Sequence, residues 1–112
     1  AVVAVENHEF VVYFEIQKNP ANPKQIAIRS TIVNPGMQPL KNFEIKYGVP
    51  PSWSLQASPP NSNTLNPLCQ NSIQQVIYLQ NNGNAPLMMK THATYLFGCQ
   101  PLSSTDNVNP IF

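Results

Sequence analysis

Residues 87–95 read Leu87-Met88-Met89-Lys90-Thr91-His92-Ala93-Thr94-Tyr95 and divide into two sets with the two-residue period of a β-strand. The set that can line a core is Met89, Thr91, Ala93 and Tyr95. The set that must face outward is Met88, Lys90, His92 and Thr94. An outward thioether, ammonium group and imidazole in line could bind a peptide, but ordinary solvated strands look the same. The stretch predicts a half-buried strand and leaves the use of its outer face open.

The same alternation recurs along the rest of the chain. The predicted core-facing sets are Val12, Phe14 and Ile16; Ile26, Ile28 and Ile32, in phase with Ser30; Phe43, Ile45, Tyr47 and Val49; and Ile73, Ile77 and Leu79. Trp53 and Leu55 predict a short strand. A last strand without clear bounds should follow Tyr95, with late core contacts from Leu102, Val108, Ile111 and Phe112.

Proline and asparagine separate these strands, because they remove backbone donors and favour turns. Loops are predicted at 18–23, 34–36 and 58–63. The residues at 81–84 (Asn-Asn-Gly-Asn) tolerate positive φ, which predicts a hairpin that pairs the Lys90 strand with residues 72–79. About seven or eight short strands predict an all-β fold, an immunoglobulin-like antiparallel β-sandwich.

Length and charge exclude several classes of protein. A chain of 112 residues is about one domain, large enough to bury a single core. Only 10% of the residues are charged and the net charge is +1, so no nucleic-acid partner is expected. The longest apolar run is about five residues, against roughly 20 for a bilayer span, which predicts a soluble domain that does not insert into membranes.

The residue types that carry catalysis are sparse. Asp106 is the one aspartate, placed in a predicted C-terminal tail, and no pair among the glutamates suggests an acid and a base. His8 and His92 have no carboxylate or cysteine at ligand spacing. No phosphate-binding or nucleophile motif is present, so neither enzyme activity nor a metal or cofactor is expected. Trp53 could anchor a ligand, but a core position beside Leu55 and Tyr47 is better supported.

The two cysteines, Cys69 and Cys99, fit no zinc or redox spacing. Two buried thiols are the expected arrangement, and the absence of an Asn-x-Ser/Thr acceptor agrees with a cytosolic protein. A secreted adhesion-type sandwich with a Cys69–Cys99 bridge is the alternative.

Five stretches, in order and spacing, resemble the γ-adaptin ear (GAE) domain of clathrin adaptors. They are 43–50 (FEIKYGVP), 53–56 (WSLQ), 58–60 (SPP), 75–77 (QVI) and 87–95. The resemblance covers nearly the whole chain. Its strongest marks are the aromatic-x-x-x-x-x-Val-Pro element at 43–50, Gln75-Val76-Ile77 and Thr94-Tyr95.

The resemblance implies a domain that binds short extended peptides of accessory proteins, carrying an aromatic-Gly-acidic-hydrophobic motif, in trans-Golgi and endosomal transport. Residues 1–112 would be one monomeric ear domain, the C-terminal appendage of a γ subunit or of a monomeric GGA adaptor. Such a protein is cytoplasmic and peripheral on trans-Golgi and endosome membranes and on clathrin-coated vesicles.

The family's binding residues carry over to six positions. Its three basic positions fall at Met88, Lys90 and His92, of which only Lys90 keeps a full charge. Its apolar wall corresponds to Gly48, Ala57 and Pro60, with Ala57 smaller than the usual leucine. The hypothesis is that Lys90 meets the peptide's acidic residue while Met88 packs against its aromatic ring. A spacer sandwich without a functioning peptide site is the alternative.

Overall fold

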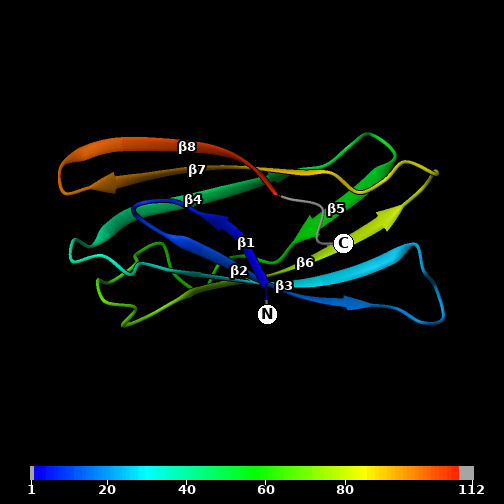
Figure 1. Ribbon diagram of the computed structural model, residues 1–112, viewed down its shortest axis with the longest axis horizontal. Coiled ribbons are helices and arrows are strands. Elements are labelled where there is room, and N and C mark those ends of the chain that lie inside the picture. The colour runs from blue at the N-terminus through cyan, green and yellow to red at the C-terminus, as the bar shows by residue number, and fades with distance from the viewer. Residues whose placement is uncertain (1, 109–112) are drawn as a thin grey trace.

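The computed structural model describes residues 2–108, which form eight strands and no helix (Figure 1). The strands are β1 (Val2–Glu6), β2 (Val11–Lys18), β3 (Gln25–Val33), β4 (Leu40–Gly48), β5 (Trp53–Ala57), β6 (Ile73–Asn81), β7 (Met89–Phe97) and β8 (Gln100–Val108). None of these residues forms a helix able to span a membrane. The predicted all-β architecture is confirmed.

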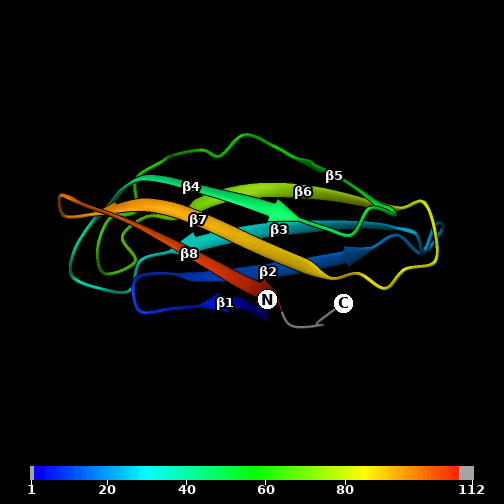
Figure 2. The same cartoon turned by 90° about the horizontal axis from the view of Figure 1, so that it is seen from above.

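The strands form two antiparallel sheets packed face to face. The large sheet has the order β1-β2-β3-β6-β5 and the small sheet the order β4-β7-β8. Figure 2 shows β4 and β5 along one side of the sandwich and β1 and β8 along the other. At the β1 and β8 side the sheets approach each other, and Asn7 Nδ2 donates to Ser104 Oγ at 3.4 Å. The β4 and β5 edges stay apart.

Alternate residues of each strand fill the space between the sheets. Fully buried side chains of the large sheet include Val12, Phe14, Ile28, Ile32, Ile73 and Ile77, and those of the small sheet include Leu40, Phe43, Met89 and Ala93. Ile16, Tyr47 and Leu55 pack against this core, and so does Trp53, whose Nε1 donates to Ala85 O at 3.1 Å. The predicted core sets are thus confirmed for the described residues. Ile111 and Phe112 lie outside them.

The predicted pairing of the Lys90 strand with residues 72–79 is wrong. β6 belongs to the large sheet, whereas β7 pairs with β4 and β8 in the small sheet. The predicted turn at 81–84 is present, since Gly83 N donates to Asn81 Oδ1 at 3.1 Å. Several further residues, including Pro86, then separate this turn from β7 and carry the chain to the other layer.

A bulge resets the phase of β4. Asn42 has a φ of 51°, and the pairing with β7 shifts between Lys41 and Glu44. Two residues of β4 therefore stand where one is expected, so that Leu40 and Phe43 both face the core. From Phe43 onward the strand follows the predicted alternation.

The prediction that both thiols are buried is also wrong, because Cys69 and Cys99 are exposed and free. Each lies in a connection between strands, Cys69 before β6 and Cys99 in the turn between β7 and β8. Asp106, predicted in a tail, lies within β8, where its Oδ2 accepts a hydrogen bond from Ser104 Oγ at 2.7 Å.

Tyr47 of β4 joins the two sheets. Its hydroxyl lies 2.9 Å from Ser30 Oγ on β3. Burial raises the pKa of Tyr47 to about 12, against the opposing effect of the Ser30 hydrogen bond. The phenol therefore keeps its proton in the folded protein at pH values where an exposed tyrosine has lost it.

This difference predicts a loss of stability in alkali. The unfolded chain releases the Tyr47 proton near the ordinary value of 10.0, and the folded chain only at about 12. The raised pKa therefore contributes stability that is complete below pH 10 and is lost as the pH rises toward 12. Urea unfolding of the wild type and of Tyr47→Phe between pH 9 and 12 measures this loss. The unfolding free energy of the wild type should fall relative to that of Tyr47→Phe as the pH rises through this window. A constant difference would contradict the assignment.

Candidate functional site

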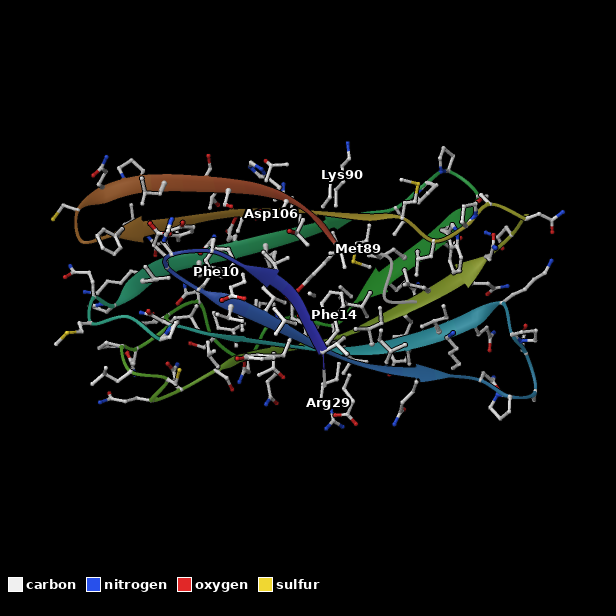
Figure 3. All side chains as sticks on the ribbon, in the orientation of Figure 1. Phe10, Phe14, Arg29, Met89, Lys90 and Asp106 are labelled. Atoms are coloured by element: carbon white, nitrogen blue, oxygen red, sulfur yellow. The ribbon has the colours of Figure 1, made fainter. Side chains whose placement is uncertain are left out.

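The outer face of the small sheet carries Gly48, Lys90 and His92 of the residues expected to bind. Lys90 on β7 lies opposite Gly48 on β4 and Asn107 on β8. Figure 3 shows the Lys90 side chain pointing away from the molecule and the neighbouring Met89 pointing into the core. Met89 is 1% exposed, which confirms the two-face interpretation of the 87–95 stretch.

Gly48, Met88 and Lys90 meet in a hollow of about 690 Å³, which is also lined by Val49, Pro50 and Leu87. We call it the Gly48 hollow. A Cβ at position 48 would meet only Lys90 O, at 3.9 Å, so the missing side chain leaves open space and is not required by packing. Met88 is 68% exposed beside it. The hollow offers an apolar surface next to an ammonium group.

Lys46 is a candidate site residue that the sequence reasoning missed. It is exposed on β4 directly opposite His92 of β7, so it shares the outer face with Lys90. Its outward phase was visible in the sequence, but the β4–β7 pairing that places it beside His92 was not. A second ammonium group thus lies on this face, one pair along from Lys90. Glu44, one pair further along this face, is the nearby negative charge.

His92 lies on the outer face but does not line the Gly48 hollow. Its Nδ1 is 2.8 Å from Thr105 Oγ1 on β8. The threonine hydroxyl can donate to this ring nitrogen or accept from it, according to the tautomer, so the contact orients the ring. His92 therefore stands between two neighbours, Lys46 on β4 and Thr105 on β8.

Pro60 lies in a separate groove of about 310 Å³ at the open side of the sandwich, lined by Phe43, Glu44, Ile45, Lys46, Pro60, Asn63, Ile73 and Gln75. We call it the Pro60 groove. Lys46 borders this groove and also lies on the outer face next to Gly48 along β4. The Gly48 hollow and the Pro60 groove are thus neighbouring parts of one surface along β4.

Ala57 lines neither of these two hollows. It is the last residue of β5, opposite Ile77, and shares the core-facing phase of Trp53 and Leu55. It is nevertheless exposed, because β5 is the edge of the large sheet at the open side of the sandwich. Ala57 therefore borders the opening, and the structure does not bring it together with Lys90.

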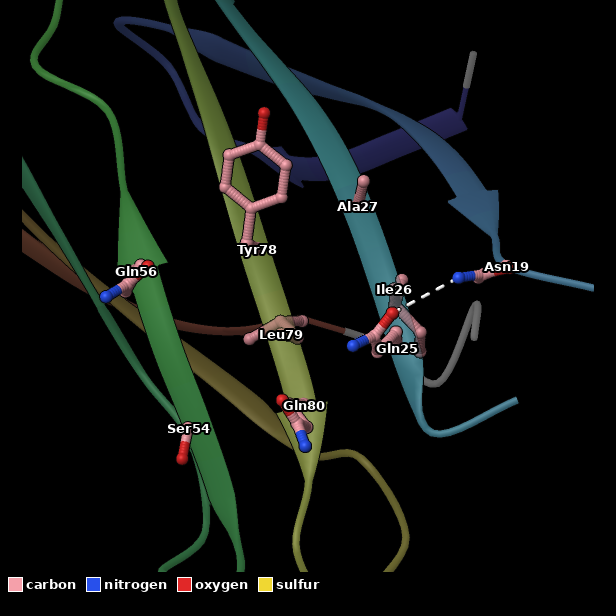
Figure 4. Close-up of a pocket in the computed structure, with 9 residues that line it drawn as sticks. All are labelled: Asn19, Gln25, Ile26, Ala27, Ser54, Gln56, Tyr78, Leu79 and Gln80. Atoms are coloured by element: carbon pink, nitrogen blue, oxygen red, sulfur yellow. Dashed lines mark hydrogen bonds between the residues drawn. The ribbon is translucent and has the colours of Figure 1, made fainter. Parts of the chain in front are cut away.

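The large sheet has a hollow of its own, of about 510 Å³, on its outer face (Figure 4). Gln56, Gln80 and the 57% exposed Tyr78 line it, and Asn19 Nδ2 donates to Gln25 Oε1 at 3.1 Å. All its lining side chains are uncharged among the described residues. A ligand with a carboxylate finds no complementary charge there.

The described residues contain no group of three or more histidine, cysteine, aspartate or glutamate side chains that could hold a metal ion. Arg29 lies on the outer face of the large sheet, where its guanidinium approaches Glu15 at 3.9 Å. Figure 3 shows Arg29 and Lys90 pointing in opposite directions. The site is therefore a shallow surface with apolar hollows and two ammonium groups, suited to binding a short acidic and apolar segment.

Two solved structures share the fold of this chain. The GAE domain of GGA2p from Saccharomyces cerevisiae aligns with a TM-score of 0.83 and 24% identity, over 95% of this chain and 92% of that chain. The GAE domain of yeast GGA1 aligns with a TM-score of 0.79 and 17% identity, over 96% and 97% of the two chains.

The chain belongs to the adaptin C-terminal domain family, whose model matches residues 1–111. A mouse (Mus musculus) relative, AP-1 complex subunit gamma-like 2, is 29% identical over 87 residues, which are 78% of this chain and 11% of that protein. The chain thus spans about a tenth of the length of this curated relative. The expectation of an adaptin ear, based on residues 43–95, is confirmed.

Proposed function

We propose that residues 1–112 are the peptide-binding appendage of a clathrin adaptor. The domain would recruit accessory proteins that carry aromatic-Gly-acidic-hydrophobic motifs, acting as a monomer in the cytoplasm on trans-Golgi and endosome membranes. The observation that carries the proposal is the Gly48 hollow, an apolar depression beside the ammonium groups of Lys90 and Lys46. Membership of the adaptin family supports it.

The distance between the Gly48 hollow and the Pro60 groove suits a motif of four residues. Gly48 and Ile45 are three residues apart on β4, roughly 10 Å in a strand. The first and fourth residues of an extended peptide are separated by about the same distance. One tetrad can therefore reach from the Gly48 hollow to the Pro60 groove.

The three side chains of the motif then each have a partner of suitable chemistry. The aromatic ring enters the Gly48 hollow against Met88, whose thioether packs well on aromatic rings. The acidic residue lies near Lys90 and Lys46, and the hydrophobic residue enters the Pro60 groove. Lys46 supplies a second positive charge on the same face as Lys90. We expect a dissociation constant of tens of micromolar, because a short peptide buries little surface and loses entropy on ordering.

Calorimetry combined with NMR chemical-shift mapping tests this proposal. A Phe-Gly-Asp-Leu peptide with short neutral flanks should bind and shift the amide signals of Gly48, Lys46 and Lys90. The same peptide with alanine in place of phenylalanine should bind at least tenfold more weakly, since the ring supplies most of the buried apolar area. An absence of binding would favour a spacer sandwich, and shifts clustered at Tyr78 would assign binding to the other face.

A further inference from the structure

The Pro60 groove lies where the large sheet loses its edge strand. β5 ends at Ala57, and Ser58 N donates to Val76 O at 2.8 Å. The chain then leaves the sheet as a loop, held at Asn61, whose Oδ1 accepts from Gln74 N at 2.8 Å. The end of β6 around Gln75 thus borders the groove without β5 beside it.

Gln75 carries an unpaired acceptor in the wall of this groove. The side chain is 8% exposed, and its Nε2 donates to Ser58 O at 3.0 Å, which assigns the other amide atom as oxygen. That oxygen, Oε1, has less than 1 Å² of exposed surface and no hydrogen-bond partner within residues 2–108. An unpaired buried acceptor destabilises a protein, so a donor from a ligand in the groove would remove this penalty.

The opposite wall offers unpaired backbone groups. Phe43 N donates to Asn63 O at 2.8 Å, on the side of β4 that faces away from β7. Because backbone groups alternate along a strand, the N–H and C=O of Ile45 and Tyr47 point to that same side. No backbone partner within the described residues occupies them. β4 therefore presents a free strand edge of two residues.

We propose that a bound peptide adds to this edge of β4 as a fourth strand of the small sheet, and that Gln75 Oε1 accepts one of its backbone N–H groups. Strand addition to an open edge is an established way for peptides to bind. A small rotation about χ3, whose energy profile is broad, would bring Oε1 toward the groove while Nε2 keeps its hydrogen bond to Ser58 O. This inference rests on the peptide-binding function proposed above and identifies how the main chain is held.

Strand addition on β4 would also place the four side chains of the motif alternately on two sides. Side chains of an added strand point alternately to the two sides. The aromatic and acidic residues, first and third, would both lie over the outer face with Lys46 and Lys90. Glycine and the hydrophobic residue, second and fourth, would both point between the sheets, where Tyr47 leaves little room beside it and the Pro60 groove takes an apolar side chain.

The test pairs a protein variant with a change in the peptide backbone. Gln75→Met keeps the length of the side chain without its acceptor, and Gln74→Met changes the exposed neighbour on the opposite face as the matched control. Each protein is titrated with the Phe-Gly-Asp-Leu peptide and with versions in which one amide is replaced by an ester, which removes one N–H. Gln75→Met should weaken binding of the parent peptide roughly 3- to 10-fold, and Gln74→Met should leave this affinity unchanged.

One ester should weaken binding to the wild type by a similar factor and have no added effect in Gln75→Met. Equal ester effects in both proteins would overturn the role of Gln75 while leaving the peptide site intact, whereas no binding of the parent peptide to the wild type would overturn both. Two wild-type measurements do not depend on the folding of a variant. The Gln75 side-chain amide signals should shift with the parent peptide but not with that ester, and exchange of the Ile45 and Tyr47 amide protons should slow. Unchanged exchange would overturn strand addition.

Discussion

Lys90→Glu should weaken binding of the Phe-Gly-Asp-Leu peptide about tenfold, from tens to hundreds of micromolar. Lys90 is exposed, so its attraction to a carboxylate is screened and amounts to about 1 kcal/mol at most. Reversal of the charge removes this attraction and adds repulsion of similar size, which together give about an order of magnitude. The effect should shrink as salt is added, because both contributions are electrostatic.

Lys24→Glu makes the same change of net charge at a distant place, the loop between β2 and β3. This control should bind like the wild type. Calorimetric titration of the three proteins at low and moderate salt measures the difference. Equal heats for Lys90→Glu and the wild type would exclude the outer face of β7 as the peptide site.

Phe10→Ala should have the largest effect on stability, a loss of about 3–5 kcal/mol. Phe10 is 1% exposed and stands edge-on to Phe43 of β4 and Tyr95 of β7, with ring centroids 5.0 and 5.5 Å apart. It enters from the connection before β2, where Asn7 Oδ1 accepts from Phe10 N at 2.9 Å. One ring from the β1–β2 connection thus packs against two rings of the small sheet, so its removal opens a cavity between the layers.

Fluorescence of Trp53, the single tryptophan, reports unfolding in urea. Phe97→Ala is the matched control, because Phe97 ends β7 and is 39% exposed. This substitution should lower the free energy of unfolding by less than about 1 kcal/mol. Similar losses for the two variants would contradict the view that Phe10 ties the layers together.

Much of the site surface could be read from local periodicity. The opposite directions of Met89 and Lys90, and the outward position of Gly48, follow from the two-residue period of their own strands. The family's positions were assigned by order and spacing, and the structure brings Gly48, Met88 and Lys90 together. Pro60 lies in the neighbouring groove, and Ala57 stands apart at the edge of β5.

The roles proposed for Lys46 and Gln75 do not follow from the periodicity of a single strand. The place of Lys46 beside His92 depends on the register between β4 and β7, and the turn signal at 81–84 had suggested a different partner for β7. Gln75 follows the core phase of Ile73 and Ile77, and nothing in its spacing shows that one amide atom is paired and the other is not. Cys69 and Cys99 were placed wrongly because burial of a loop residue has no period.

The sequence alone determined most of the strands, their buried faces and the residue types on the outer face, because these depend on interactions between near neighbours along one strand. The tertiary structure alone decided which strands pair, which edges stay open and which polar atoms lack partners. Those features depend on how two layers pack and on where β5 leaves β6. The proposed peptide surface on β4 belongs to the second kind, since it lies where two sheet edges remain apart.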